Sequence, residues 1–294
     1  MGLRSRGRGT GVAAAVAALA LVLTACGGSD EEAVTEVAED AKFAAGTTMA
    51  KFNEAGEITI GVKTDQPGIG FLEPGADSPT GFDIEIAKIV AAELGIEPSG
   101  IEWKETVSAN REPFLQNETV NMVAASYSIT DERLELVGQA GPYYVTGQQL
   151  LVKKDDTSIN GPDDLGGKKV CSVTGSTSIA TVEEDYGANP VPFSTYQECV
   201  NQLLNASVDA VTTDGAILLG YAAQNPDELK VVGEAFSEER YGLGYTKDDS
   251  EFCNFLNETL QKSFDNGSWA AAFEKTLGKA GVETPSPPPL DPCP

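Results

Sequence analysis

Charged side chains that could bind a small charged molecule occur at a few positions of this chain, and Arg133 and Asp214 are the clearest of them. A guanidinium group is a planar fork that can meet a carboxylate with two parallel hydrogen bonds. Arg133 is either such a clamp or a solvated charge beside Asp131 and Glu132. Asp214 ends an apolar run, so it accepts a hydrogen bond from an ammonium group, caps the helix that follows, or does both. Together the pair would suit a ligand with both a carboxylate and an ammonium group.

A third candidate is the loop 174–178 (TGSTS), which lies between an expected strand and an expected helix. A helix N-terminus carries free N–H groups and the positive end of the helix dipole, so it favours an anion. The same loop could equally be a capped turn that binds nothing. It is too short for a P-loop, and no lysine follows its glycine, which argues against nucleotide binding.

Composition excludes several classes of function. The 294 residues include no histidine, which rules out Ser-His-Asp and Cys-His nucleophilic sites and metal sites that contain histidine. The formal net charge of −25 repels nucleic acid and anionic lipid headgroups. We therefore expect no nucleic-acid partner, no metal and no cofactor. The hydrophobic content of 41% still allows a sizeable core, and the length favours two lobes or domains.

The first 26 residues have the pattern of a targeting segment. A basic stretch from Arg4 to Arg8 precedes an apolar run at 12–23, which is shorter than the ~20 residues that span a bilayer. Residues 23–26 (LTAC) then resemble the bacterial lipobox. We expect a signal peptide at 1–25, lipidation of Cys26 with palmitate among the lipids, and a flexible tether at 26–50. The protein would be extracytoplasmic and anchored to the cell membrane; an ordinary secretory signal near a free cysteine is the alternative.

Four more cysteines fit an oxidising compartment, where disulfides persist. Four cysteines allow three connectivities. We favour Cys171–Cys199 and Cys253–Cys293, because each pair would close a loop within one lobe. The second pair would also hold the proline-rich tail against the body. Four buried free thiols are the alternative, and the absence of C-x-x-C spacing argues against zinc.

Strands and helices alternate along the body of the chain. Apolar and β-branched runs predict strands at 57–63, 101–105, 120–124, 169–173, 190–193, 209–212 and 241–245. Apolar residues at helical spacing predict helices at 82–94, 111–117, 178–186, 196–205, 216–224, 251–265 and 268–277. Such alternation is typical of mostly parallel sheets covered on both faces, whose ligands bind beyond the carboxyl ends of the strands. Two α/β units joined by extended runs near 149–153 and 241–245 would form a hinge.

Five motifs, in this order, resemble the polar amino-acid-binding proteins of ABC importers, solute-binding protein family 3. They stand at 81–85 (GFDIE), 126–133 (SYSITDER), 141–144 (GPYY), 173–178 (VTGSTS) and 208–214 (VDAVTTD). Within that family, the runs 65–70 (DQPGIG) and 108–111 (SANR) are most similar to the glutamate-binding lipoproteins. The resemblance covers about residues 57–278. It implies an α/β, type II periplasmic-binding-protein fold, with a two-strand hinge and a ligand cleft between lobe 1 (51–148 plus 247–294) and lobe 2 (149–246).

The resemblance also implies a set of ligand-binding residues. They are Arg133, Asp214, Arg111, Ser126, Ser128, Ser108, Thr174, Ser176 and Thr177. Arg133 would hold the α-carboxylate of an amino acid with help from the serines, and Asp214 would accept hydrogen bonds from its α-ammonium group. The loop 174–178 would close over the carboxylate from the second lobe. Arg111 would pair with the distal carboxylate of an acidic ligand; otherwise it pairs with Glu112 or Glu118.

Three other side chains near this set allow narrower expectations. Asp65 stands where some family members place a residue that reads the ligand tail. Since an unpaired carboxylate beside a distal carboxylate would be repulsive, we expect Asp65 to pair with Lys63 or Arg111, or to point away. Tyr127 and Tyr144 either line the cleft or belong to the core.

The expected function is therefore a monomeric, extracytoplasmic, lipid-anchored receptor without enzymatic activity. It would bind a free amino acid, glutamate first, and deliver it to an ABC permease. Three alternatives remain: a dehydratase-like enzyme on the same fold with Asp65 or Asp214 as its acid, an amino-acid sensor, and a receptor for aspartate or glutamine. Turnover of a candidate substrate would identify the enzyme, whereas saturable binding without turnover favours the receptor.

Overall fold

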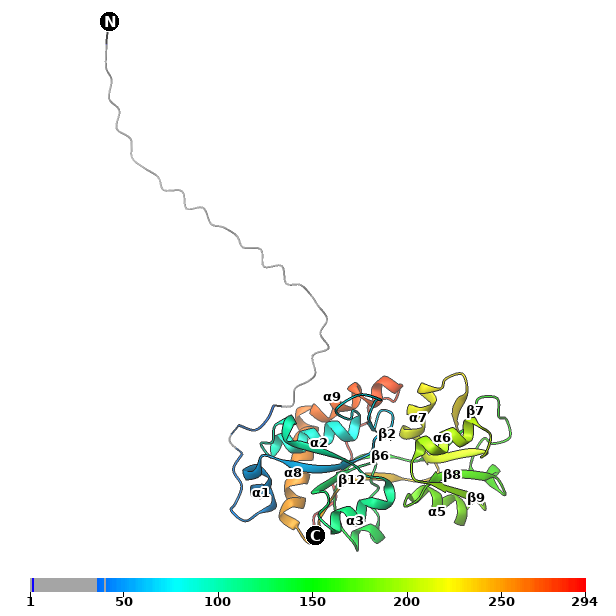
Figure 1. The fold of residues 1–294 in the computed structure, drawn as a ribbon, viewed down its shortest axis with the longest axis horizontal. Helices are drawn as coiled ribbons and strands as arrows, with labels where there is room; N and C mark the ends of the chain where they lie inside the picture. Colours follow the sequence, from blue (N-terminus) through cyan, green and yellow to red (C-terminus); the bar gives the residue numbers. More distant parts are fainter. Residues whose placement is uncertain (1, 3–35, 40) are drawn as a thin grey trace. The chain divides into compact units, whose positions relative to one another are not determined.

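Two five-stranded sheets organise the part of the chain that the computed structural model describes (Figure 1). The described residues are 2, 36–39 and 41–294. Cys26 and nearly all of the predicted signal peptide therefore lie outside them. Each sheet is the centre of one α/β lobe, and Figure 1 shows the two lobes side by side with β6 and β12 running between them.

The sheet of the first lobe has the strand order β4-β1-β5-β12-β6. Its strands are β1 (Ile58–Val62), β4 (Ile101–Glu105), β5 (Met122–Ala124), β6 (Gly138–Thr146) and β12 (Glu239–Tyr245). β1 is parallel to β4 and β5, and β12 is antiparallel to β5 and β6. A short hairpin of β2 (Asp65–Gln66) and β3 (Gly70–Phe71) follows β1. The carboxyl ends of β1 and β5 thus lie at one edge of the sheet, where binding residues are expected.

Helices cover the first sheet on both faces. They are α1 (Thr48–Ala55), α2 (Phe82–Glu93), α3 (Arg111–Gln116), α4 (Asp131–Leu134), α8 (Ser250–Asn266) and α9 (Ser268–Lys275), with single turns η1 (Pro98–Gly100), η2 (Ser108–Asn110) and η4 (Leu277–Ala280). α2 is apolar on most sides and is almost entirely buried. Its first residue, Phe82, lies 5.3–6.0 Å (ring centroids) from Tyr143, Tyr144, Trp269 and Phe273. This aromatic cluster joins α2, β6 and α9.

The sheet of the second lobe has the order β11-β7-β10-β8-β9. Its strands are β7 (Gln148–Lys153), β8 (Lys169–Val173), β9 (Asn189–Phe193), β10 (Ala210–Asp214) and β11 (Leu229–Val232), and its helices are α5 (Thr177–Glu184), α6 (Tyr196–Leu204) and α7 (Gly215–Gln224), with the turn η3 (Pro162–Leu165). β8 is parallel to β9 and β10, whereas β7 is antiparallel to β10 and β11. Because β8, β9 and β10 are parallel and precede α5, α6 and α7 in turn, these three helices begin at the same edge of the sheet, beyond the carboxyl ends of the strands.

The chain crosses between the lobes twice. The first crossing lies between β6 and β7, and the second lies between β11 and β12. The two crossings bond to each other, since Ser237 accepts from the N–H of Gln148 at 3.1 Å and Phe236 donates to its carbonyl. The expected boundary of lobe 2 at residue 246 is wrong, because β12 pairs with β5 and β6 and so belongs to the first sheet. The boundary between the lobes depends on which strands β12 pairs with through backbone hydrogen bonds, and residue type alone does not reveal that pairing.

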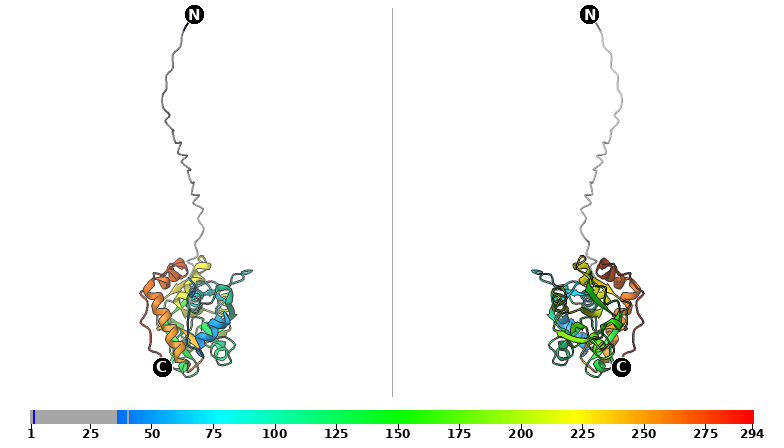
Figure 2. Two further views of the ribbon diagram at one scale, coloured as in Figure 1. Left: turned by 90° about the vertical axis from the view of Figure 1, so that its left-hand side faces the viewer. Right: turned by 90° about the vertical axis from the view of Figure 1, so that its right-hand side faces the viewer.

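Both ends of the described body are attached to the first lobe. The expected tether at 26–50 extends too far, because Thr47 caps α1 and Phe52 of that helix is buried in the core. At the other end, a disulfide joins Cys253 of α8 to Cys293, and Asn257 donates to the carbonyl of Asp291 at 2.8 Å. In Figure 2 the C-terminal segment runs alongside α8, as the favoured cysteine pairing predicts. The second disulfide, Cys171–Cys199, joins β8 to α6 within the second lobe.

Candidate functional site

Eight of the nine predicted ligand-binding residues surround one small cavity between the lobes. They are Ser108, Arg111, Ser126, Ser128, Arg133, Ser176, Thr177 and Asp214. Thr174 is the exception, since its side chain is exposed and its N–H donates to the carbonyl of Phe193 beside β9. The cavity has a volume of about 10 Å³. This volume is about that of one water molecule, so the lobes must move apart to admit an amino acid.

Arg111 begins α3 and is only 2% exposed. Its guanidinium group donates to four backbone carbonyls: Ser108 at 3.2 Å, Ala125 at 3.1 Å, Ser126 at 3.0 Å and Gly175 at 3.0 Å. Burial, followed by the charge of Arg133, lowers the pKa of Arg111 to about 10, so it remains a cation at neutral pH. The alternative of an ion pair with Glu112 or Glu118 is not what the structure contains. Arg111 is a buried cation held by neutral oxygens.

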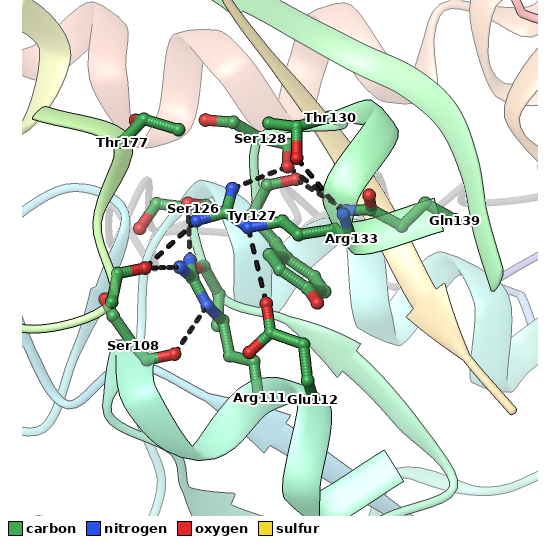
Figure 3. Close-up of polar contacts among 12 residues, drawn as sticks. Ser108, Arg111, Glu112, Ser126, Tyr127, Ser128, Thr130, Arg133, Gln139 and Thr177 are labelled. Atoms are coloured by element: carbon green, nitrogen blue, oxygen red, sulfur yellow. Dashed lines mark hydrogen bonds and ion pairs between the residues drawn. The ribbon is translucent and has the colours of Figure 1, made fainter. Parts of the chain in front are cut away.

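Arg133 lies in α4, whose first turn is capped by the Thr130 hydroxyl. It donates to the carbonyl of Ser128 at 2.7 Å and to that of Gly175 at 3.0 Å, and its Nε lies 3.3 Å from Oε1 of Glu112. Figure 3 shows both arginines extending over the ring of Tyr127. The ring centroid lies 4.4 Å from Cζ of Arg111 and 5.1 Å from Cζ of Arg133, within the range of cation–π attraction. Tyr127 therefore supports the arginine pair, while Tyr144 packs into the aromatic core around Phe82.

The carbonyl oxygen of Gly175 joins the two lobes. It belongs to the loop before α5 in the second lobe, and both arginines of the first lobe donate to it. Gly175 has a φ of +82°, and a Cβ there would lie 2.9 Å from Cα of Ala109. Only glycine combines this left-handed backbone with so close an approach. The predicted anion-binding loop thus contacts the arginines through its backbone.

Asp214 ends β10 at the N-cap position of α7, but its side chain makes no capping hydrogen bond. It accepts a hydrogen bond from the hydroxyl of Tyr241 on β12 instead. Burial, followed by the negative charge of Glu239, raises the pKa of Asp214 to about 7. Of the two roles that the sequence left open, helix capping is therefore excluded, and Asp214 is a buried carboxylate at the cavity.

Five residues at or beside the cavity were not predicted as ligand-binding. Ser178, Tyr196 and Thr213 line it. Lys63 is buried at the end of β1 and donates to Oγ of Ser108 at 2.7 Å. Burial, followed by the charge of Arg111, lowers the pKa of Lys63 to about 7. Glu239 accepts hydrogen bonds from Ser128 and Thr177. The position of Lys63 after a parallel strand was the one signal in the sequence that could have identified it.

Asp65 does not pair with Lys63 or Arg111. Its Oδ2 accepts from the backbone N–H groups of Tyr196 at 2.8 Å and Gln197 at 3.4 Å, at the start of α6 in the other lobe. The hydroxyl of Tyr221 on α7 donates to its carbonyl. Nearby, a Cβ on Gly220 would lie 2.2 Å from the carbonyl oxygen of Pro67, so the backbones of the two lobes are in direct contact. Of the three expectations for Asp65, pointing away from the two cations is the one the structure contains.

Comparisons with known proteins agree on one family. The family model described as "Bacterial extracellular solute-binding proteins, family 3" matches residues 58–279. Glutamate-binding protein GluB of Corynebacterium efficiens is 40% identical over 268 residues, which cover 87% of this chain and 86% of that protein. The ABC transporter glutamine-binding protein GlnH of Bacillus subtilis is 35% identical over 266 residues, covering 89% of this chain and 94% of that protein.

Solved structures share the fold. An ancestral arginine-binding protein bound to glutamine has a TM-score of 0.71 at 36% identity, covering 76% of this chain and 98% of that one. The ancestral amino acid-binding protein AncCDT-1, described as a precursor of cyclohexadienyl dehydratase, has a TM-score of 0.72 at 29% identity, covering 79% of this chain and all of that one.

Proposed function

Because the chain belongs to the bacterial extracellular solute-binding proteins of family 3, we propose that it is the receptor of an ABC importer and that its ligand is an acidic amino acid, glutamate first. The predicted type II periplasmic-binding-protein fold is confirmed, and the chain is a solute-binding protein for polar amino acids. The observation that carries the finer proposal is a cluster of three buried basic side chains of the first lobe, Lys63, Arg111 and Arg133, with the buried carboxyl group of Asp214 on the second lobe at the same cavity.

The two ends of the ligand backbone would be held by opposite lobes. Arg133 of the first lobe would bind the α-carboxylate, and Asp214 of the second lobe would accept from the α-ammonium group. Both side chains border the same cavity, which supports this assignment. A desolvated charge pair is strong only when both partners are present, so a zwitterion would hold the two lobes together.

The side-chain carboxylate of an acidic ligand would meet Arg111 and Lys63. All the hydrogen bonds of Arg111 go to neutral carbonyls, so its charge is available to an anion that displaces one of them. Lys63 is held beside it through Ser108. Glutamine offers no charge to these groups, which is the physical reason for preferring glutamate. The similarity to glutamate-binding protein GluB, at 40% identity, supports the same choice.

Delivery to a permease would require the protein to stay near the membrane. Among the residues that the structure describes, no helix is long and apolar enough to cross a membrane. We propose that a lipid on Cys26 supplies the anchor, that the described body acts outside the cytoplasm, and that it binds its ligand as a monomer.

The test of this proposal is a thermal-shift screen of the amino acids followed by calorimetric titration. Glutamate should raise the apparent stability by mass action, and Arg133→Ala should weaken its binding by about 2–5 kcal/mol, or roughly thirtyfold to several thousandfold. Arg240→Ala is the matched control, because Arg240 pairs with Asp291 outside the cavity. A protein stabilised by no amino acid, or an Arg133 variant with wild-type affinity, would refute the assignment.

The likeness to AncCDT-1 keeps an enzyme as the second candidate. Incubation of the wild-type protein with cyclohexadienyl substrates addresses it directly. Turnover would show that the protein is a dehydratase and not a receptor. Saturable amino-acid binding without turnover would exclude the dehydratase.

A further inference from the structure

Glu239 is a buried carboxylate at the point where the chain returns from the second lobe to the first. It is the first residue of β12 and is 4% exposed. The proposed ligand contacts of Arg133, Asp214, Arg111 and Lys63 do not involve it. Moving a carboxylate out of water is costly unless hydrogen bonds or a cation compensate, so its position needs a physical explanation.

Three hydroxyl groups converge on the Glu239 carboxylate. Its Oε2 accepts from Oγ of Ser128 at 2.5 Å and from Oγ1 of Thr177 at 3.0 Å, and its Oε1 accepts from Oγ of Ser237 at 2.9 Å. Ser128 belongs to the first lobe, and Thr177 begins α5 in the second. Both line the cavity. One carboxylate oxygen therefore links a hydroxyl from each wall of the site.

The hydroxyl groups do not neutralise the charge. Among the ion pairs of the described residues, none involves Glu239. Its charge instead acts on Asp214, where it is the second largest cause, after burial, of the raised pKa. The charged and titratable groups that face Asp214 from the surrounding elements are Glu239 and Tyr241 of β12, Arg111 of α3, Arg133 of α4, Tyr196 of α6 and Tyr144 of β6. Two neighbouring carboxylates, neither of them in an ion pair of the described residues, would favour a positively charged guest.

We propose that Glu239 is a positioning residue for the ligand ammonium group: it joins the lobes through Ser128 and Thr177, and with Asp214 it forms a two-carboxylate acceptor that only a protonated amine satisfies. This inference rests on the proposed function. The ammonium group would contact Asp214, while Glu239 would act through that carboxylate and through the two hydroxyls. The protonated amine would also lower the pKa of Asp214, so binding near or below pH 7 would release a proton.

The test compares Glu239→Gln with Glu238→Gln. The first variant keeps the shape of the side chain and an oxygen that can accept from the hydroxyls, and the second removes the same charge from the exposed neighbouring position. Calorimetry would measure the affinities for L-glutamate and for glutarate, which has both carboxylates but no amine. Glu239→Gln should lower the ratio of the two affinities by about tenfold, the scale of a partly screened charge pair, and Glu238→Gln should leave it unchanged.

A second readout needs no ligand. Carboxyl ¹³C NMR of the ligand-free protein should show Asp214 titrating at a lower pH in Glu239→Gln than in the wild type, with no change in Glu238→Gln. Equal losses for glutamate and glutarate, or an unchanged Asp214 titration, would overturn the inference, because a purely structural residue would behave in that way. A wild-type protein that binds no amino acid would refute the proposed function, and the NMR titration would still decide whether Glu239 acts on Asp214.

Discussion

At the scale of single residues, the site differs from a surface ion-pair network because its cations are bonded mainly to backbone oxygens. Arg111 contacts four carbonyls, and Arg133 contacts two carbonyls and Glu112. The carbonyl contacts fix the guanidinium planes without neutralising their charge, and of the two arginines only Arg133 has a carboxylate partner among the described residues. The positive charge is thereby preorganised for an anionic guest, although the formal net charge of the whole chain is −25. Contact interactions can outweigh that charge because salt screens it beyond roughly 8 Å.

Arg111→Ala should weaken glutamate binding much more than glutamine binding. The distal carboxylate would lose a charge-assisted partner worth about 1.5–3 kcal/mol, or roughly ten- to a hundredfold in affinity, whereas the amide would lose a weaker contact. Parallel calorimetric titrations of the two amino acids would measure the difference. Equal weakening of both ligands would remove Arg111 from the pocket for the ligand side chain.

The lowered pKa of Lys63 gives a pH dependence with a definite sign. A carboxylate guest binds the charged form of Lys63, whose pKa without ligand is about 7, so glutamate affinity should fall as pH rises above 7. The charged groups that face Lys63 are Arg111, Asp65, Asp83 and Arg133. Lys63→Arg keeps the charge at every pH and should remove this alkaline decline.

Titration of the wild type and of Lys63→Arg between pH 6 and 9 measures the effect, and glutamine, which lacks the distal charge, is the control ligand. A wild-type profile that stays flat above pH 7 would contradict the role given to Lys63. As pH falls below 7, glutamate affinity should also fall, because protonation of Asp214, whose pKa is about 7, weakens the ammonium contact.

At the scale of secondary-structure elements, the contacts between Asp65 and α6 connect the lobes at a second place besides the carbonyl of Gly175. A lobe-1 carboxylate accepts from two N–H groups at the start of a lobe-2 helix, where the helix dipole favours a negative charge. The start of α6 is also capped from within by Thr195 and Glu198, so the helix does not depend on Asp65 for its own stability. The contact therefore stabilises the joined arrangement of the lobes.

Asp65→Ala should lower ligand affinity by about 1–2 kcal/mol, or roughly five- to thirtyfold, because the ligand-bound form needs the lobes together. The thermal stability of the ligand-free protein should change much less. Asp77→Ala, at an exposed position of the loop between β3 and α2, is the matched control. Unchanged affinity in Asp65→Ala would show that the contact contributes nothing to closure.

Periodicity in the sequence predicted most elements, because strands such as β8 (Lys169–Val173) and helices such as α8 (Ser250–Asn266) carry their own apolar pattern. It did not predict β6 as a nine-residue strand, since Gly141 and Pro142 are typical of turns and only pairing with β12 makes the segment extended. The family motifs in the sequence predicted which residues form the site, but they did not identify Glu239 or Tyr196. Tyr196 reaches the cavity, and Glu239 reaches the hydroxyl groups of Ser128 and Thr177 that line it, only after both crossings have brought the lobes together, which no local pattern encodes.

At the scale of the whole molecule, the proposed membrane anchoring depends on the predicted lipid on Cys26, which lies outside the described residues. Cys26→Ser should move the protein from the membrane fraction to the soluble fraction of the cells, because the thiol that would carry the lipid is lost. Immunoblotting of fractionated cells measures the change, and Cys253→Ser with Cys293→Ser is the control that removes a disulfide but leaves the anchor. A Cys26 variant that stays with the membrane would refute the lipidation site.

Both guanidinium groups already donate to the carbonyl oxygen of Gly175. A ligand must therefore compete with this backbone acceptor for the two arginines. A neutral molecule that offers one amide or hydroxyl oxygen replaces like with like and gains little. A carboxylate replaces a neutral oxygen with a charged group, which adds direct ion-pair attraction and can meet a guanidinium with two parallel hydrogen bonds. Competition from the Gly175 carbonyl thus lowers the affinity for neutral solutes more than the affinity for anions. The protein can therefore remain unoccupied among abundant neutral solutes until an anion is present.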